Sequence, residues 1–524
     1  MQRIQFAGLF LFALTCSAVT LHGQHDPHRN AIRHIAAGDL KKASTELKKA
    51  NPDDPETKFV EMVALLKLGD VPAAGDKARD TLNAGLPFER LLVGPRKALT
   101  PLYESDAWKA LSDQHGDGVL LHGPMLGTVT EDGASFWVRT SRPATLKIDV
   151  FEADAATVIR SSPPRNTTAR QDFTTILRVE GLRPRTSYRY EVLIGDQKMV
   201  VENARFTTHP KQGDSATFHV AFGGGAGYVP EWERMWDTIE KLRPNAFLTL
   251  GDNVYIDDPT QPLTNHYCYY RRQSRPEWRR LIASTSVYSI YDDHDFGMND
   301  CVPGPEIESP PWKRTVWNTF RENWVNPYYG GGERQPGCWY DFYIGDVHFI
   351  MLDGRYYRTR KPQPSMLGPV QKAWLLETLK NSRGTFKVLA SPVPWTEGIK
   401  PGSRDPWDGF PDEREEIFSH LEANRINGVF LIAADRHRTD LRITKRRQSY
   451  DLYEFESSKL TNRHTHPVVK TDTLVWGYNK TCSFGLIRFD TTKPDPQVRF
   501  EAITIDGEKV HEFELKLSQL QHRD

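Results

Sequence analysis

The spacing of apolar residues changes twice along the chain. Between residues 26 and 115 the spacing is helical. Between residues 118 and 209 apolar and polar residues alternate, as in ASFWVR, and between residues 214 and 520 short apolar runs alternate with helical stretches. Periods of about 3.6 and 2 residues are typical of amphipathic helices and half-buried strands. The pattern therefore predicts an α-helical segment, a β-sandwich and a layered α/β domain, in that order.

The predicted helical segment, residues 26–115, contains two similar units that are punctuated by Gly38-Asp39 and Gly69-Asp70. The units resemble tetratricopeptide-like helix hairpins. Because about three repeats are normally needed for an independent array, we expect this pair to dock on the rest of the protein. A plain helical cap and a binding surface for a protein partner both fit the pattern.

The predicted β-sandwich, residues 118–209, has a turn signal at Glu131-Asp132-Gly133 and closes with LRPRTSYRYEVLI. It resembles a fibronectin type III or immunoglobulin-like domain. The resemblance rests on LxPxTxYxY, formed by Leu182, Pro184, Thr186, Tyr188 and Tyr190. Such a module is typical of a spacer or a support for a lid, and nothing in it indicates chemistry.

The predicted α/β domain carries aspartates at the ends of its strands. Its strand candidates are TFHVAF, AFLTLGD, VYSIYDD, VHFIMLD, FKVLASP and GVFLIAAD, followed by YDLYEFE, CSFGLIRFD and QVRFEAITI. Four of the first six end in aspartate, at Asp252, at Asp292 with Asp293, at Asp353 and at Asp435. The carboxyl ends of strands line the ligand crevice in open α/β sheets, so these aspartates predict one acidic pocket.

Several carboxylates in one pocket are costly to bury unless a cation neutralises them. GDNVY, DDHD and ADRH supply oxygen ligands, and the last two add an imidazole. Oxygen donors with histidine and a phenolate suit iron, manganese, calcium or zinc. The motifs therefore predict a metal site, with a solvated acidic loop as the alternative.

The order of the motifs resembles one family. GDNVY, YDDHDFGMND, LDGRYYR, LGPVQKAWLLETL, SPVPW, WDGFPDER and ADRH follow one another as in the alkaline phosphatase D (PhoD-like) family of metallophosphoesterases. GPMLGTVTEDGASFWVRT resembles the N-terminal β-domain of that family. The resemblance implies a multidomain chain whose α/β core has two facing β-sheets flanked by helices, with two or more metal ions at the strand ends.

The resemblance also implies roles for single residues. Asp252 would be the bridging carboxylate and Tyr255 a phenolate ligand. Asp293, Asp435 and His437 would be further ligands, and His294 would protonate the leaving group. Asn299 and Arg355 lie in the same motif blocks and would hold the phosphate. Fe³⁺ and Ca²⁺ are the ions that the family suggests.

The chain departs from the family pattern at two places. Where the family commonly has FxSC, this chain reads FGGGAGY, which puts Gly225 at the position of the thiolate ligand. Ala434 replaces the glycine of the terminal Gly-Asp pair and keeps both ligands. The glycine-rich loop could cradle phosphate on its backbone N–H groups, but its spacing matches neither common fingerprint, so a tight structural turn is the favoured interpretation.

Two hypotheses about function follow. The first is an exported phosphoesterase in which a metal-activated water attacks phosphate mono- or diesters carried by a small molecule, a lipid or a cell-envelope polymer. The second is a catalytically weak relative that acts as a binding or scaffold protein, which the loss of the thiolate favours. Retention of the other ligands favours the enzyme.

The net charge and the N-terminal sequence bear on binding to nucleic acid and on localisation. Lys+Arg and Asp+Glu both number 68, so no net field draws the chain to nucleic acid, and we predict no such binding. Residues 1–23 read as a signal peptide, because their apolar run from Phe6 to Leu14 is shorter than the ~20 residues of a membrane span. We therefore expect a periplasmic or extracellular protein without a transmembrane anchor.

Two further expectations concern cysteine and arginine. Cys268, Cys301, Cys338 and Cys482 remain after signal removal, an even number that predicts one or two disulfides of unknown pairing in an oxidising compartment. The basic run YYRRQSRPEWRR superficially suggests nucleic acid. At helical spacing, however, we expect its aromatic residues in the core and its arginines on a solvated face.

Overall fold

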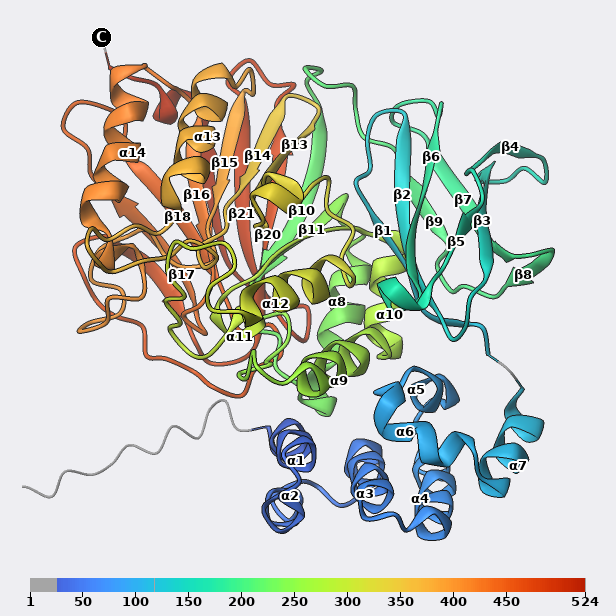
Figure 1. The fold of residues 1–524 in the computed structure, drawn as a ribbon. Helices are drawn as coiled ribbons and strands as arrows, with labels where there is room; N and C mark the ends of the chain where they lie inside the picture. The colour runs from blue at the N-terminus through green and yellow to red at the C-terminus, as the bar shows by residue number, and fades with distance from the viewer. Residues whose placement is uncertain (1–25, 117, 524) are drawn as a thin grey trace, which may run out of the picture.

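The computed structural model describes residues 26–116 and 118–523, and the predicted signal peptide lies outside them. The chain forms a helical segment, a small β-sandwich and a large two-sheet domain (Figure 1). Within the described residues, no helix is long and apolar enough to cross a membrane.

The helical segment is a series of short helices, most of which begin at a capping residue. Asp26, Asp39, Asp54 and Asp70 each accept a hydrogen bond from a backbone N–H in the first turn of α1 to α4, which satisfies a donor that the helix leaves open. The helices are α1 Pro27–Ala36, α2 Leu40–Leu47, α3 Pro55–Leu68, α4 Val71–Asn83, α5 Phe88–Val93, α6 Arg96–Tyr103 and α7 Asp106–His115. Helices α1 and α2 pack together, as do α3 and α4, and α1 also contacts α9 (Pro262–Gln273) of the large domain.

The β-sandwich consists of two antiparallel sheets around a core that includes Phe136, Val150 and Tyr190. One sheet contains β1 Leu120–Gly127, β2 Gly133–Thr140 and β6 Thr174–Glu180. The other contains β3 Thr145–Glu152, β4 Val158–Ser161, β5 Arg165–Asn166, β7 Ser187–Ile194, β8 Gln197–Met199 and β9 Arg205–Thr207. The Tyr188 hydroxyl accepts a hydrogen bond from the Arg183 N–H at 2.9 Å, a corner typical of immunoglobulin-like sandwiches. The fibronectin-type class itself stays a prediction.

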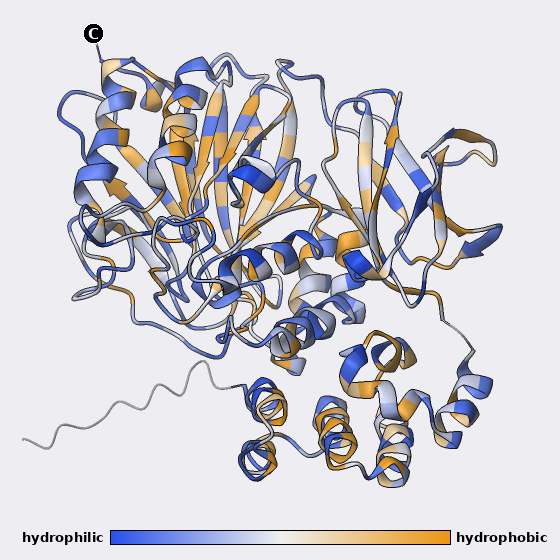
Figure 2. Cartoon of the chain, viewed as in Figure 1, coloured by the Kyte–Doolittle hydropathy of each residue, from blue (hydrophilic) through white to orange (hydrophobic). Residues whose placement is uncertain are grey.

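The large domain has two facing sheets, as predicted. The first has the order β12-β11-β10-β20-β21-β22 and the second β13-β14-β15-β16-β18-β17-β19. Phenylalanines fill the space between them: Phe455 of β18 stacks on Phe500 of β21 with ring centroids 4.6 Å apart. Figure 2 shows apolar residues concentrated on these central strands. Every strand candidate named for this domain in the sequence forms one of its strands.

The strands of the first sheet are β10 Thr217–Gly223, β11 Ala246–Leu250, β12 Ser286–Ile290, β20 Ser483–Asp490, β21 Gln497–Thr504 and β22 Lys509–Lys516. Those of the second are β13 Tyr340–Ile344, β14 Val347–Met351, β15 Phe386–Ala390, β16 Val429–Ala433, β17 Thr439–Thr444, β18 Leu452–Ser457 and β19 Leu474–Tyr478. The helices are α8 Arg234–Lys241, α9 Pro262–Gln273, α10 Pro276–Ser284, α11 Asp293–Phe296, α12 Trp312–Arg321, α13 Gly368–Asn381 and α14 Pro411–Ala423.

Two expectations from the sequence are wrong. Cys268, Cys301, Cys338 and Cys482 are buried free thiols, so the described residues contain no disulfide between them, and they act as small apolar core residues. In α9, Arg271 and Arg272 are buried rather than solvated: Arg271 contacts Asp26 of the helical segment, and Arg272 pairs with Glu233 at 2.7 Å. Acidic partners from other parts of the chain make this burial possible.

Candidate metal centre

Three loops that follow strands bring the predicted residues together. β10, β11 and β12 are parallel neighbours, so the loops after β11 and β12 leave the same edge of the first sheet. The loop after β16 comes from the second sheet and contributes His437. These strands are short and fully buried, so each places polar residues at its end without exposing them.

Asp252, Tyr255 and His437 are in direct contact. The Tyr255 hydroxyl donates to Asp252 Oδ2 at 3.1 Å and lies 3.2 Å from His437 Nε2. His437 Nε2 is 3.9 Å from Asp252 Oδ2. Asp252 and His437 are at most 2% exposed and Tyr255 is 6% exposed. A carboxylate, a phenol and an imidazole therefore converge in one buried place.

Three of the predicted ligands have an unusual backbone conformation. Asp252, Asp435 and His437 have φ angles of 52°, 70° and 49°. Residues other than glycine adopt this left-handed conformation rarely, and strained residues gather at functional sites, where the surrounding structure holds them. Here the strain lies on the loops that carry predicted ligands.

Asp293 and His294 complete the buried group at the start of α11. One ligand atom from each of Asp252, Asp293 and His294 lies within 4.8 Å of the others. The Arg355 guanidinium lies 3.7 Å from the Asp293 carboxylate and contacts Asp292 directly. Asp293 Oδ2 also accepts a hydrogen bond from the Asp300 N–H at 2.6 Å.

His294 is connected to the helical segment through Asp257. Its Nδ1 contacts Asp257 Oδ1, and Asp257 Oδ2 contacts the guanidinium of Arg29 in α1. The same guanidinium donates to the Tyr255 carbonyl at 3.2 Å. The first helix of the chain therefore reaches the loop that carries Asp252 and Tyr255.

The charges in this pocket are unbalanced without a cation. Burial raises the pKa of Asp252 well above its usual range, and the neighbouring Asp293 adds to the effect although His294 opposes it. Burial and Asp252 also raise the pKa of the Tyr255 phenol. Burial would raise the pKa of Asp293 as well, but Arg355 and His294 outweigh it and hold that pKa at about 2.

The donor atoms present fit a metal ion. Asp252 Oδ1 and His437 Nδ1 are buried and have no hydrogen-bond partner. Buried polar atoms are normally satisfied, so such orphans indicate a ligand. A cation would also favour the ionised carboxylate and phenolate, the states that burial opposes.

The remaining predicted residues lie at the margin. Asp435 is half-buried, with its carboxylate 3.4 Å from the Arg436 guanidinium. Asn299 is exposed. The Arg355 guanidinium donates to both Asp405 oxygens, at 2.7 and 3.2 Å, in addition to Asp292, so in this structure carboxylates occupy the donors that were predicted to bind phosphate.

Comparison with known proteins decides the family of this domain. Residues 220–473 match the family described as PhoD-like phosphatase. This region is a PhoD-like phosphatase domain. Residues 117–212 match a domain of unknown function, DUF7800, which corresponds to the β-sandwich.

Relatives of the PhoD-like domain agree with this result. Alkaline phosphatase D of Bacillus subtilis (strain 168) is 24% identical over 236 residues, which cover 38% of this chain and 40% of that protein. The match thus spans less than half of that relative's length. The structure of PhoD has 16% identity and a TM-score of 0.63, covering 75% of this chain and 91% of that chain. A purple acid phosphatase from yellow lupin seeds has 10% identity and a TM-score of 0.58, covering 75% and 74%. The structural likeness shows that the fold is shared.

Gly225 of the PhoD-like domain lies next to the proposed ligands. It has a φ of 73°, and a Cβ atom there would lie 3.3 Å from His437 Cδ2. The Gly225 N–H donates to the Gly251 carbonyl at 3.3 Å and the Ala226 N–H to the Asp252 carbonyl at 2.7 Å. These donors are used within the protein, which supports the tight-turn interpretation over a phosphate cradle.

Sequence reasoning missed four residues near this centre: Arg29, Asp257, His464 and His466. One ligand atom from each of His437, His464 and His466 lies within 4.8 Å of the others. The sequence His-Thr-His at residues 464–466 was the available signal, but it lies outside the family motifs. Asp293, Asp300 and Asp405 form another acidic group, but Arg355, Arg358 and Lys400 already neutralise it.

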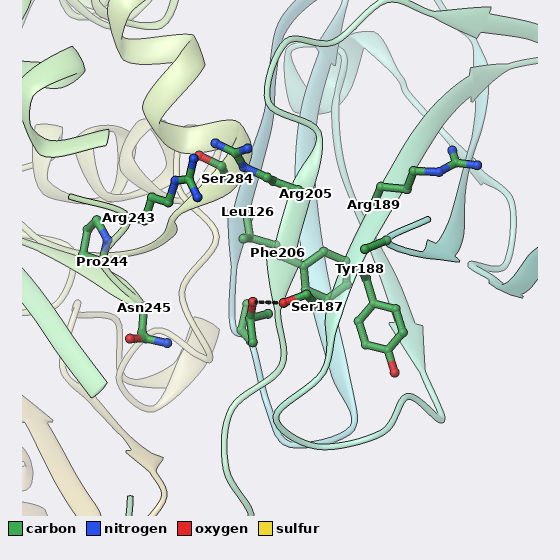
Figure 3. A pocket seen from close by; sticks show the side chains of 13 residues that line it. Leu126, Ser187, Tyr188, Arg189, Arg205, Phe206, Arg243, Pro244, Asn245 and Ser284 are labelled. Atoms are coloured by element: carbon green, nitrogen blue, oxygen red, sulfur yellow. Dashed lines mark hydrogen bonds between the residues drawn. The ribbon is translucent and has the colours of Figure 1, made fainter. Parts of the chain in front are cut away.

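Two of the cavities at the PhoD-like domain lie where it meets another part of the chain. One, of about 840 Å³, lies between the helical segment and the glycine-rich loop, and Asp54, Tyr228, Tyr255 and Asn462 contribute to its lining. The other, of about 350 Å³, lies between the sandwich and the large domain (Figure 3). Asn245 in its lining precedes β11, whereas Asp252 follows that strand, so this second cavity is at the opposite edge of the sheet.

Proposed function

We propose that this protein is a metal-dependent phosphoesterase that hydrolyses phosphate monoesters or diesters. The main support is that five side chains lie together in one buried place: Asp252, Tyr255, Asp293, His294 and His437. Asp252 and His437 each have a buried polar atom without a hydrogen-bond partner. The match of residues 220–473 to the PhoD-like family supports the same reaction class.

The donor set indicates which residues would hold the ions. Asp252, Tyr255 and His437 would hold one ion, and Asp252 and Asp293 a second one, with Asp435 as a further ligand. A carboxylate with phenolate and imidazole suits Fe³⁺, and a site of carboxylates suits Ca²⁺, among the ions considered. Bound cations would neutralise charge on the phosphoryl oxygens and lower the pKa of water in the site.

His294 would act as the general acid. Asp257 accepts a hydrogen bond from Nδ1–H and orients the ring, so that Nε2–H would face the ester. As a water oxygen bonds to phosphorus and the ester P–O bond breaks, this proton passes to the departing alkoxide, and a proton from the water restores the ring. Such catalysis typically contributes about 10²–10⁴-fold.

The substrate would be a phosphoester of a small molecule, a lipid or a cell-envelope polymer. The signal-like N-terminus supports an exported protein that acts in the periplasm or outside the cell. The helical segment offers a surface for a protein partner. These assignments follow from the sequence pattern and the reaction class together.

One observation favours a different function. Gly225 replaces the family thiolate, which is compatible with a weak or inactive relative that serves as a binding or scaffold protein. The enzyme is the better-supported alternative, because five costly buried groups are kept together.

The deciding experiment measures metal content and hydrolysis on the same preparation. Elemental analysis is combined with assays of a chromogenic monoester and a chromogenic diester, and Asp252→Asn serves as the comparison. We expect bound metal and activity in the wild type, and loss of both in the variant. Metal-free, inactive protein after reconstitution with iron, calcium, manganese and zinc would contradict the proposal.

A further inference from the structure

His464 and His466 lie beside the metal centre without an assigned role. They follow β18, and their Nε2 atoms are 3.1 Å apart. Their ring planes are nearly perpendicular, at 89°, with centroids 4.3 Å apart. The two nitrogens thus converge, and both rings are half-buried. In zinc sites the metal lies about 2.0–2.1 Å from each imidazole nitrogen, so two nitrogens at this separation can share one ion.

His437 provides a third nitrogen and an independent indication of a ligand. Its ring centroid lies 5.3 Å from that of His464 and 5.7 Å from that of His466. His437 is 1% exposed, and its Nδ1 atom is buried without a hydrogen-bond partner. One ring nitrogen from each of His437, His464 and His466 lies within 4.8 Å of the others, and three imidazoles gathered in this way are a donor set for a metal ion.

His437 borders the position from which the family thiolate is missing, and the loop that leads to His464 and His466 is hydrogen-bonded to the same turn. A Cβ atom at Gly225 would lie 3.3 Å from His437 Cδ2 and 3.3 Å from Ser458 Oγ. The loop that begins at Ser458 is bonded to the glycine-rich loop, since the Leu460 N–H donates to the Gly224 carbonyl at 3.0 Å and the Thr461 N–H to Gly225 at 3.2 Å. The His464 N–H donates to Asn462 Oδ1 at 2.8 Å, which fixes the next turn.

We propose that His464 and His466, together with His437, bind a metal ion in place of the absent thiolate. This inference rests on the proposed metal dependence and concerns ligands that the family motifs do not include. Imidazole is a borderline donor that suits zinc, iron, cobalt or nickel, whereas a thiolate selects softer ions. With glycine at position 225, imidazole ligands would replace the thiolate ligand, and the metal site would be kept.

The test uses Co²⁺ as a spectroscopic probe. Full-length protein is freed of metal with a chelator and titrated with Co²⁺, with visible absorption and elemental analysis as readouts. The double variant His464→Ala/His466→Ala is compared with wild type, and His420→Ala, a half-buried histidine of α14 that bonds the Leu376 carbonyl, serves as the control.

We expect the double variant to lose one metal equivalent, or to bind Co²⁺ at least about tenfold more weakly, with a changed absorption band. The control should match wild type, and added imidazole should restore the band in the double variant. His464→Gln/His466→Gln repeats the test with polar side chains of similar length in case the alanines disturb the loop. Wild-type stoichiometry, affinity and spectrum in both double variants would overturn the proposal.

The same data separate this inference from the proposed function. Wild-type protein that binds Co²⁺ through these histidines but hydrolyses no phosphoester would contradict the phosphoesterase and support the histidine site. Double variants that keep all their metal and their activity would contradict the histidine site alone.

Discussion

His294 is held through only one of its two ring nitrogens. Nδ1 contacts Asp257, while the ring lies against Tyr255 with centroids 4.6 Å apart. The other nitrogen is therefore free of this contact, on a residue grouped with Asp252 and Asp293. A ring fixed in this way can deliver a proton without being displaced from the centre.

Replacing this histidine should separate catalysis from metal binding. For His294→Ala we expect turnover to fall about 10²–10⁴-fold, because the general acid is lost. Metal content should stay close to wild type, since Asp252, Tyr255, Asp293 and His437 remain. The loss should be larger for esters of poorly acidic alcohols than for nitrophenyl esters, which need little protonation. Equal loss of metal and turnover would contradict the assigned role.

His209 predicts a pH dependence of stability away from the centre. It is buried between the sandwich and the large domain, and burial lowers its pKa to about 4 from 6.5 although the backbone of Asn245 opposes the shift. The unfolded chain therefore binds more protons than the folded one between these values, so stability is lost as pH falls from about 6.5 to about 4. In His209→Leu, urea unfolding should depend less steeply on pH over that range, and an unchanged slope would exclude the assignment.

The ligands that could be predicted from the sequence are those whose position is set locally. Asp252, Asp293 and His437 follow buried strands, and strand ends of one sheet meet at one edge. Arg29 and His464 could not be predicted in this way. Arg29 reaches Asp257 across 228 residues of sequence, and His464 depends on how a long loop folds back on the glycine-rich turn.

Helix α1 of the helical segment is attached to the large domain by buried polar contacts. Asp26 at its N-cap contacts Arg271 of α9, and the Arg271 guanidinium lies 4.0 Å from the Tyr228 ring centroid. One turn later, Arg29 binds Asp257 and the Tyr255 carbonyl. Tyr267 of α9 also donates to Glu56 of α3 at 2.9 Å. These buried polar contacts orient the helical segment on the large domain.

Arg29→Ala should therefore impair the reaction through the contact of Arg29 with Asp257. We expect lower turnover with unchanged metal content, and a greater loss for poor leaving groups, because Asp257 no longer holds His294 firmly. Arg29→Lys should recover part of the activity. Lys42→Ala, on an exposed position of α2, is the matched control. An Arg29→Ala variant that is less stable but has wild-type kinetics would show a merely structural contact.

For the whole molecule, the candidate metal centre lies where loops from the two large sheets meet. Asp252 and Asp293 follow strands of the first sheet, and His437 follows a strand of the second. An ion bound between them would link the layers in addition to the phenylalanine packing. Its removal would also leave neighbouring carboxylates without a neutralising charge.

Metal removal should consequently lower the melting temperature of the full-length protein. A ligand that binds only the folded state stabilises it by RT ln(1 + [L]/Kd), so the midpoint should rise with added metal until the sites are full. Thermal unfolding followed by circular dichroism, with and without a chelator, measures this shift. Asp252→Asn should show a much smaller response to metal, and an equal response would place the ions elsewhere.

The contact between Arg29 and Asp257 has a consequence for how the protein matures. A ribosome makes α1 first, but the segment that carries Asp257, His294 and His437 follows hundreds of residues later. A growing chain therefore contains α1 before it contains Asp257. A fragment that begins after α1 contains Asp257 but lacks Arg29, which contacts it. Full hydrolytic activity should be reached only when both parts of one polypeptide have met, so full activity reports that the helical segment and the large domain are correctly assembled.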